Sequence, residues 1–546
     1  MSRAASAQLN QSGELADYNL FSTHSALSDA LAREGAGADR ESLRVLGAEL
    51  GTATMFALGD AANRNPPELR VFDRFGARCD QVVFHPAWHE LLGRLVAAGL
   101  HTGPWAEPRP GAHVARAAGY LLWSEIENGT QCPATMSYGA VPALAPQEQD
   151  FGLWLRLLKS REYDARFAPA ASKRGVLLGM GMTERQGGSD VRTNTTRAVA
   201  VGARGPGCEY RLTGEKWFFS APMCDAFLVL AQAPGGLSCF LVPRFLPDGT
   251  INALHLQRLK DKLGNRSNAS SEVEFDAAYG LLLAEEGRGI PAILEMGVYT
   301  RLDNAIGSAG IMRQCVAQAI HHARGRRAFG RLLSEQPLMR NVLADLALEC
   351  EAAVVLVMRL ARAFDAQQDE GAALLRRVLT PIAKYWICKR APLVCAEAME
   401  VLGGNGYIED GPIARRFRES PLNSIWEGSG NIMCLDVLRA LRREARTREA
   451  LEELLGGARG RDARFDRFLG ELLSDLVDPE ESELRARELT QRLAVAAQAA
   501  LLLAHGPEPS ADAFLASRVG SGPPAAFGTL PRASDFASLT ARIFSP

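Results

Sequence analysis

The sequence predicts a mostly α-helical protein with a small β-barrel domain near its middle and a helical C-terminal extension. Long stretches on both sides of the middle repeat apolar residues at helical spacing. From Gly207 the pattern changes to short β-type runs separated by Gly, Pro and Asp. After Lys389 lysine disappears, and all later basic residues are arginine. We therefore expect four segments: residues 1–177, 178–289, 290–443 and 444–546.

The N-terminal segment contains several apolar patterns with helical spacing. A short capped helix is expected over Ser25–Leu31 after an irregular start. A longer helix is expected from Glu41 to about Asn63, ended by Asn65-Pro66-Pro67 because proline cannot continue a helix. Two more helices are expected over His85–Leu100 and Gly111–Glu127.

The middle segment contains four runs with strand character. These are Tyr210–Thr213, Phe227–Ala231, Ser238–Val242 and Ser271–Phe275. Pro247-Asp248-Gly249 lies between two of them and has the composition of a tight turn. This part of the chain is therefore expected to form the β domain, set between helical segments.

The C-terminal half returns to helical spacing after Gly289. Long helices are expected over Leu302–Arg327, Gln336–Gln367 and Thr380–Leu402. The last should begin at Thr380-Pro381, a good N-cap and first-turn pair, and end at Gly403–Gly406. Helices of this length with one apolar face favour a bundle. In the extension, helices are expected over Glu449–Leu455, Phe465–Leu476 and Glu481–Ala504.

Composition limits the function classes. With a net charge of −2 over 546 residues, no global basic field draws the protein to nucleic acid, although a local patch is possible. No apolar run is long enough to cross a membrane, and residues 1–18 lack the plan of a signal peptide. The ten cysteines show no metal-type spacing, so buried free thiols in the cytoplasm are expected, with no metal site.

The stretch Gly181–Val191 concentrates glycines, hydroxyl residues and charges. Glycine lets a backbone approach a ligand closely, and exposed N–H groups beside hydroxyls form an anion cradle. A tight polar turn between two buried segments explains the same composition equally well.

Two further stretches, Lys216–Ala221 and Ser424–Asn431, follow in a fixed order. With Gly181–Val191 they resemble the acyl-CoA dehydrogenase flavoproteins. The segments Lys260–Ala269 and Ser424–Arg439, together with the C-terminal extension, are most similar to the AidB-like branch, associated with the adaptive response to DNA alkylation. The resemblance runs from about Phe84 to about Arg443.

The resemblance implies FAD as cofactor and acyl-CoA as substrate. Besides the residues of the two motifs described next, those that it places at the FAD are Met182, Thr183, Gly188, Ser189, Trp217, Phe218, Ser220, Asn423, Ser429 and Asn431. Two positions depart from the family pattern: Thr193 replaces a smaller residue, and Ser220 replaces threonine but keeps the hydroxyl. For the aromatic run, packing inside the β domain is the alternative; we expect it for Phe219 and flavin contact for Phe218.

Two other motifs imply an oligomer. Arg326 to Gly330 resembles the Arg-x-x-Phe-Gly motif, in which Arg326 and Phe329 would reach the FAD of a neighbouring subunit. Gly403 and Gly404 belong to a second signature that brings backbone against the same diphosphate. A homotetramer, a dimer of dimers, is implied. A basic cluster at a helix end is the alternative for Arg326.

Glu427 is the candidate catalytic base. It lies between Trp426 and Gly428, and a carboxylate among apolar groups has a raised pKa. From context alone, a surface carboxylate is the commoner explanation. The resemblance places Glu427 where the family carries the base that removes the α-proton of the acyl thioester. The other place used by the family, near Tyr299–Leu302, offers no carboxylate.

The AidB-like branch implies binding of double-stranded DNA through the C-terminal region. The candidate contacts are Arg439, Arg442 and Arg443, followed by further arginines. Acidic residues are interleaved with them, so a solvated, salt-bridged helix face is the alternative. Two other functions also remain open: a short- or branched-chain metabolic dehydrogenase without a DNA role, and a non-catalytic scaffold that protects DNA.

Overall fold

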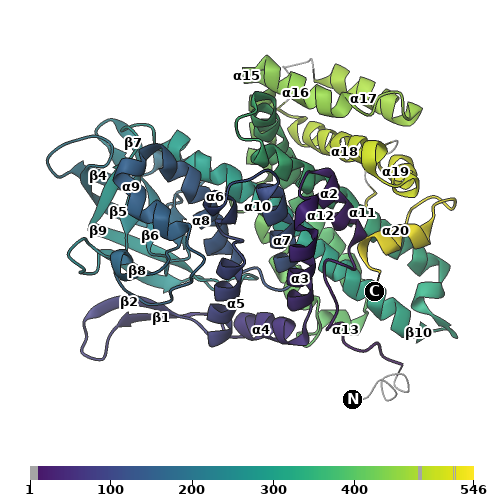
Figure 1. The fold of residues 1–546 in the computed structure, drawn as a ribbon, viewed down its shortest axis with the longest axis horizontal. Coiled ribbons are helices and arrows are strands. Elements are labelled where there is room, and N and C mark those ends of the chain that lie inside the picture. The colour runs from purple at the N-terminus through teal and green to yellow at the C-terminus, as the bar shows by residue number, and fades with distance from the viewer. Residues whose placement is uncertain (1–9, 477–482, 520–521, 523, 546) are drawn as a thin grey trace. The chain divides into compact units, whose positions relative to one another are not determined.

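The protein is described by a computed structural model over residues 10–476, 483–519, 522 and 524–545. The chain forms two compact units, each built from separated stretches (Figure 1). The helical unit comprises Met1–Phe56, Pro110–Ile126 and Arg301–Pro546, and the barrel unit comprises Ala57–Arg109 and Glu127–Thr300. Each unit combines parts of several of the four consecutive segments expected from the sequence. The division into those four segments stays a prediction.

The barrel unit is organised around a seven-stranded sheet of order β3-β5-β4-β6-β7-β9-β8. Its strands are β3 Leu178–Gly181, β4 Arg197–Ala200, β5 Glu209–Ser220, β6 Ala226–Ala233, β7 Gly236–Pro243, β8 Leu254–Leu259 and β9 Ser270–Leu283. Pairing runs from β3 to β5, β9, β7 and β6, and then back to β3. This closed circuit confirms the predicted central β domain as a barrel.

The four predicted strand runs lie within β5, β6, β7 and β9. Phe219, Phe227 and Phe240 are fully buried, and the rings of Phe219 and Phe227 lie 4.4 Å apart. The predicted turn is present: Gly249 N–H donates to the carbonyl of Leu246. Strands β3, β4 and β8 were not predicted, nor was the hairpin of β1 Glu68–Phe72 and β2 Arg78–Val83.

Helices complete the barrel unit. They are α5 Pro86–Ala97, α6 Gly103–Ala106, α8 Gln131–Leu144, α9 Glu148–Leu158 and the first part of α10 Gly289–Gly325. His85 caps α5 by accepting a hydrogen bond from Ala87 N–H, and Pro86 occupies the first turn. The predicted apolar face of α5, from Trp88 to Val96, is buried.

The helical unit is a bundle around three long helices: the rest of α10, α11 Pro337–Asp365 and α12 Glu370–Val401. Its other helices up to residue 443 are α2 Ser25–Arg33, α3 Arg40–Leu50, α7 Ala112–Ser124, α13 Gly404–Tyr407, α14 Ala414–Glu419 and α15 Gly430–Arg443. The short hairpin β10 Arg327–Ala328 and β11 Arg331–Leu332 follows α10.

Four details of the predicted helices were wrong, the simplest being that α10 begins at Gly289 and not at Leu302. The helix expected over Glu41–Asn63 is two helices, α3 and α4 Ala53–Arg64, which separate at Gly51. A side chain at Gly51 would collide with the carbonyl of Tyr18, so glycine is needed for this close approach. Helix α2 has no side-chain cap.

The fourth correction concerns α12, which begins ten residues before Thr380. Asp369 is the true N-cap and accepts a hydrogen bond from Ala372 N–H at 2.7 Å. Thr380 donates instead to the carbonyl of Arg376 within the helix, and Pro381 is an interior proline.

The C-terminal extension packs into the helical unit. Its elements are α16 Ala445–Gly456, α17 Ala463–Asp475, α18 Ala486–His505, α19 Glu508–Phe514, a π-helical turn Leu515–Val519 and α20 Phe536–Ile543. The start expected at Glu481 lies outside the described residues. Buried Arg518 pairs with Asp345 and Glu349 of α11, and Arg542 pairs with Glu351. The extension is therefore anchored to the bundle by buried charges.

All ten cysteines are free thiols, and eight of them are buried. Among the helices that the structure describes, none combines the length and apolar character needed to span a bilayer.

Candidate active site

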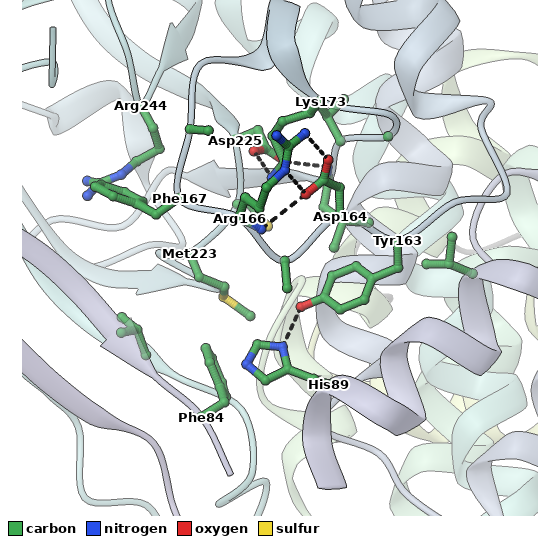
Figure 2. A pocket seen from close by; sticks show the side chains of 18 of the residues that line it. Phe84, His89, Tyr163, Asp164, Arg166, Phe167, Lys173, Met223, Asp225 and Arg244 are labelled. Carbon is green, nitrogen blue, oxygen red and sulfur yellow. Dashed lines mark hydrogen bonds and ion pairs between the residues drawn. The ribbon is translucent and has the colours of Figure 1, made fainter. Parts of the chain in front are cut away.

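The barrel unit contains a cavity of about 250 Å³, lined by side chains that include Phe84, His89, Tyr163, Lys173 and Arg244 (Figure 2). None of the predicted cofactor residues lines it. The predicted residues of this unit gather instead around the loop that follows β3.

Strand pairing brings the first of these residues together. Met180 of β3 pairs with Ser220 of the antiparallel strand β5. Trp217 N–H donates to the carbonyl of Thr183 at 2.8 Å. Met182 and Thr183 are therefore brought opposite Phe218 and Trp217. Gly188 folds back on the same point, where an added Cβ would collide with the Thr183 hydroxyl.

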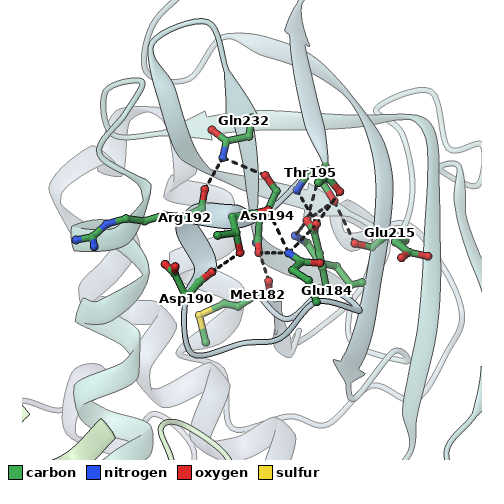
Figure 3. Close-up of polar contacts among 12 residues, drawn as sticks. Met182, Glu184, Asp190, Arg192, Asn194, Thr195, Glu215 and Gln232 are labelled. Atoms are coloured by element: carbon green, nitrogen blue, oxygen red, sulfur yellow. Dashed lines mark hydrogen bonds and ion pairs between the residues drawn. The ribbon is translucent and has the colours of Figure 1, made fainter. Parts of the chain in front are cut away.

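The loop is held by Glu184, a residue to which the sequence assigned no role (Figure 3). Its buried carboxylate accepts hydrogen bonds from Thr195 N–H at 2.6 Å and the Thr196 hydroxyl at 2.6 Å. It also forms an ion pair with Lys216 Nζ at 2.8 Å. Burial alone would raise the pKa of Glu184, but the charge of Lys216 and these hydrogen bonds lower it to about 2.

The rest of the loop is fixed by its own polar groups (Figure 3). Asn194 donates to the carbonyl of Met182 at 2.8 Å, and Gln232 donates to the carbonyl of Arg192. Thr193, the departure from the family pattern, donates to the carbonyl of Asp190 at 2.7 Å. The larger residue thus closes a turn and does not disrupt the loop.

Several predicted groups of this unit remain available to a ligand. Among the described residues, the hydroxyls of Thr183, Ser189 and Ser220 have no hydrogen-bond partner. Phe218 is 52% exposed, whereas Phe219 is buried in the barrel core, as predicted. Lys260 Nζ lies 3.5 Å from the centre of the Trp217 ring. Free hydroxyls and an exposed aromatic face therefore occur together.

In the helical unit, Glu427 lies in a loop between α14 and α15. Its backbone adopts φ +58°, a left-handed conformation that costs free energy for a non-glycine residue. Two cations, the partly buried Arg301 and the buried Lys384, hold this loop by its carbonyls. Arg301 Nε donates to Glu427 O at 3.0 Å, and Lys384 Nζ donates to Trp426 O at 2.8 Å and to Gly428 O at 2.5 Å. Burial lowers the pKa of Lys384 to about 8.

The other predicted residues of this loop differ in availability. Asn423 is buried, and its amide bonds to Ser308 and to the Trp426 ring nitrogen. Asn431 accepts a hydrogen bond from Arg487 of α18 at 2.8 Å. Ser429 is exposed at the N-terminus of α15. The side-chain amide of Asn423 thus positions Trp426. If Asn423 also contacts the cofactor, as predicted, the same amide must make that contact in addition to these two hydrogen bonds.

Two predicted motifs lie next to each other through the N-terminal segment. Arg326 donates to the carbonyl of Asn10 at 2.7 Å, and Asn405 donates to the side chain of Gln11 at 3.2 Å. The Arg326–Gly330 hairpin and the turn containing Gly403 and Gly404 are thereby joined. Phe329 at the hairpin tip is 99% exposed, and an added Cβ at Gly403 or Gly404 would meet open space.

The predicted DNA-binding arginines lie at the end of α15. Asp436 is shared by three guanidinium groups, those of Arg301, Arg377 and Arg439, at 3.1, 2.7 and 3.6 Å. Arg442 and Arg443 are exposed in the last turn. Other arginines of the extension are neutralised: Arg446 pairs with Glu370, Arg448 with Glu452, and Arg464 with Asp462 and Asp512.

Three family profiles match the chain in order. "Adaptive response protein AidB N-terminal domain" matches residues 10–165, "Acyl-CoA dehydrogenase, middle domain" matches 179–278, and "Acyl-CoA dehydrogenase, C-terminal domain" matches 287–442. The AidB protein of Escherichia coli (strain K12) is 51% identical over 507 residues, 92% of this chain and 93% of that protein. The chain belongs to the AidB-like branch of the acyl-CoA dehydrogenase family.

Solved structures agree with this membership. Caenorhabditis elegans ACDH-11 in complex with C11-CoA is similar with a TM-score of 0.83 and 25% identity, covering 98% of this chain and 92% of that one. The apo-form of Bd2924 is similar with a TM-score of 0.82 and 27% identity, covering 91% and 99%. This AidB-like chain is thus an acyl-CoA dehydrogenase, and FAD is its cofactor.

The barrel unit of this acyl-CoA dehydrogenase fits FAD. The free hydroxyls of Thr183, Ser189 and Ser220 can donate to the many acceptor atoms of the cofactor, and the exposed Phe218 ring can lie against a planar ring system. These residues meet around one loop, whose shape Glu184 and Lys216 hold.

Sequence reasoning missed the charged residues that position the site. Glu184 and Lys216 lie inside the two motifs, but only packing shows that they form a pair. Arg301 and Lys384 are cations on long, largely apolar helices. A charged residue on the buried face of such a helix needs a polar partner, so these two cations could have been recognised from the sequence as candidate positioning residues.

Proposed function

We propose that Glu427 is the base of an acyl-CoA α,β-dehydrogenase, removing the α-proton of the acyl thioester. The observation that supports this most directly is the left-handed backbone of Glu427 inside a loop whose carbonyls are held by Arg301 and by buried Lys384. Backbone strain of this kind persists where the surrounding structure fixes it, and it concentrates at functional sites. Gly428 follows with φ +103°, and an added Cβ there would collide with Met433.

The chemistry divides between protein and cofactor. FAD, when bound, accepts the β-hydrogen as hydride. Glu427 accepts the α-proton at a carboxylate oxygen, while the loop keeps that oxygen in place. The ring nitrogen of Trp426, the residue before Glu427, donates to the side chain of Asn423 at 3.0 Å and so adds a second anchor to the loop.

Glu427→Gln tests this role. The amide keeps the size of the side chain but cannot take a proton, so turnover should fall by about 10² to 10⁴-fold. The yellow colour and the fold should be unchanged. Glu444→Gln, an exposed position downstream, is the matched control. Unchanged turnover in Glu427→Gln would refute the assignment, because another group would then have to remove the α-proton.

We further propose that Arg326, Phe329, Gly403 and Gly404 contact the FAD of a neighbouring subunit in a homotetramer. Phe329 is fully exposed, and Tyr407, beside the glycine turn, is 79% exposed. Exposed aromatic side chains of this kind support an interface with another subunit at this surface. Phe329→Ala should lower flavin occupancy and shift the mass measured by light scattering below that of a tetramer. Full flavin occupancy and an intact tetramer in Phe329→Ala would contradict the proposal.

We also propose that the protein binds double-stranded DNA in the response to alkylation damage, through Arg439, Arg442 and Arg443. The support is the positive charge gathered around α15: Asp436 in its middle serves three guanidinium groups, and the exposed Arg442 and Arg443 follow in its last turn. Such contacts are to phosphates and independent of base sequence. The free buried thiols support the expected cytoplasmic location.

The DNA test requires point variants. Removal of the extension would expose Asp345, Glu349 and Glu351, which are buried against it, so a truncated chain would report misfolding as well as DNA binding. The triple variant Arg439→Gln, Arg442→Gln, Arg443→Gln should bind duplex DNA more weakly, with the salt slope reduced by roughly one for each arginine that had neutralised a phosphate.

Arg446→Gln with Arg448→Gln is the matched control, because both arginines already have acidic partners. It should retain DNA binding. If the native protein does not bind DNA at low salt, the ordinary metabolic dehydrogenase becomes the better description, and screening of short acyl-CoA substrates follows.

A further inference from the structure

The cavity of the barrel unit is lined by none of the predicted cofactor residues. Figure 2 shows the side chains that surround it. Its wall is formed by β2 and the start of α5, the segment between α9 and β3, the turn between β5 and β6, and Arg244 after β7. Its volume of about 250 Å³ exceeds that of an engineered cavity that binds benzene, about 150 Å³. It is smaller than most pockets for drug-sized ligands. The cavity can therefore hold one small organic molecule.

The charges around the cavity leave one cation without a partner. The acidic residues in the wall each have a cation of their own: Asp80 pairs with Arg78, Glu162 with Arg174, Asp164 with Arg166, and Asp225 with Lys173. Arg244 is 2% exposed, and no carboxylate of the described residues lies within ion-pair distance of it.

The contacts of Arg244 confirm this imbalance. Its Nη2 donates to the carbonyl of Asp80 at 2.9 Å, its Nη1 reaches the carbonyl of Leu254 at 3.5 Å, and its Nε has no partner within the described structure. Burial lowers the pKa of Arg244 to about 10, so the guanidinium stays charged at neutral pH. A buried charge of this kind is costly unless an anion pairs with it.

The remaining wall combines apolar and aromatic side chains with a few neutral polar ones, among them Gln81 and Ser160. The rings of Phe84 and Trp88 stack with centres 3.8 Å apart, and the Trp88 ring N–H is buried without a partner in the described structure. Phe167 lies under the Arg244 guanidinium, and Met223 projects into the region between Phe84 and Tyr163 (Figure 2). Tyr163 is bonded to His89 at 2.7 Å, and burial lowers the pKa of His89, so this pair adds no charge.

We propose that this cavity binds a small monocarboxylate with an apolar body, its carboxylate paired with Arg244 and its body among Phe84, Trp88 and Met223. The cation selects an anion, and a carboxylate matches the fork of donors on a guanidinium. The aromatic wall excludes purely hydrophilic anions such as inorganic phosphate. No residue assigned to FAD binding or proton removal lines this cavity.

The test uses the purified, flavin-loaded protein with benzoate and isovalerate as probes and benzyl alcohol as the neutral analogue. Binding is followed by saturation-transfer NMR and by tryptophan fluorescence. Benzoate should bind saturably, with benzyl alcohol weaker by about ten-fold or more. Arg244→Met should weaken benzoate by about ten-fold or more. Arg166→Met is the matched control: its arginine is largely exposed and already paired, so affinity should change by less than about two-fold.

Met223→Trp is a second variant that keeps Arg244 and fills the cavity, and it should abolish binding even if Arg244→Met fails to fold. Flavin absorbance and acyl-CoA turnover should be unchanged in Arg166→Met and Met223→Trp, which separates this site from the dehydrogenase site. The proposal is overturned if neither carboxylate binds, if benzyl alcohol binds equally well, if only inorganic phosphate binds, or if Met223→Trp retains affinity.

Discussion

Glu184 and Lys216 form a fully buried ion pair, with the carboxylate and ammonium 2.8 Å apart, at the base of the loop that carries Met182, Thr183 and Ser189. The pair joins two motifs that are more than twenty-five residues apart in the sequence. Because Thr195 and Thr196 bond to the same carboxylate, one buried charge fixes both ends of the loop. The position of the candidate FAD groups therefore depends on this pair.

Lys216→Met should destabilise the barrel unit strongly. The Glu184 charge would stay buried without its counter-ion, at a cost of about 3 kcal/mol. The temperature at which flavin is released should fall by roughly 6 to 12 °C. Arg185→Met, which breaks the exposed pair with Glu215 in the same loop, should cost less than about 1 kcal/mol. The double variant Lys216→Met, Glu184→Gln should recover part of the loss, and a purely additive result would contradict the coupling.

The same pair predicts the response to acid. The pKa of Glu184 is lowered to about 2, so the unfolded chain binds this proton more readily than the folded protein does. The stabilisation is fully present above the ordinary carboxyl pKa of about 4.3 and is lost as pH falls from there through about 2. Flavin release measured against pH should shift to lower midpoints in native protein than in Glu184→Gln. Equal acid midpoints would show that Glu184 does not control the loop.

How far the sequence predicted this fold depends on the element. Long amphipathic patterns such as Trp88 to Val96 located helices correctly, because periodicity survives into packing. Thr380-Pro381 led to a wrong start for α12, because a good local capping pair does not show that the helix already begins after Asp369. Strands β3 and β4 are four residues each, too short to show alternation.

The candidate site shows a similar division. The sequence motifs identified Thr183, Trp217 and Glu427 as candidate site residues, because each lies in a short recognisable motif. The pairs Glu184–Lys216 and Arg301–Asp436 join residues far apart in the sequence, and nothing local indicates such a contact. The cavity around Arg244 was missed for the same reason, since its wall comes from four separate segments.

Arg518→Met should loosen the C-terminal extension. Buried Arg518 bonds to Asp345 and Glu349, and its loss would leave Asp345 without a cation in the described structure, at a cost of about 3 to 5 kcal/mol. Limited proteolysis should then cut after α18 much faster than in native protein. Arg464→Met is the control, because its partners Asp462 and Asp512 are on the surface. Equal cleavage rates in the two variants would mean that other contacts anchor the extension.

Lys384→Met tests whether the loop around Glu427 must be held for turnover. The change removes the donor to the carbonyls of Trp426 and Gly428, so the strained backbone of Glu427 can relax and move its carboxylate. A small misplacement of a catalytic group costs about 10²-fold in kcat. Flavin content should be measured alongside kcat, because Ser429 and Asn431, which flank the same loop, are predicted FAD contacts. Arg376→Met removes a cation from the same helix that stacks on Phe364 and does not contact this loop. It should leave kcat within about two-fold, since an exposed or half-exposed charge contributes little to a distant loop. A native kcat in Lys384→Met would show that the loop keeps its shape without the ammonium, and the strain at Glu427 would then have to be maintained by Arg301 alone.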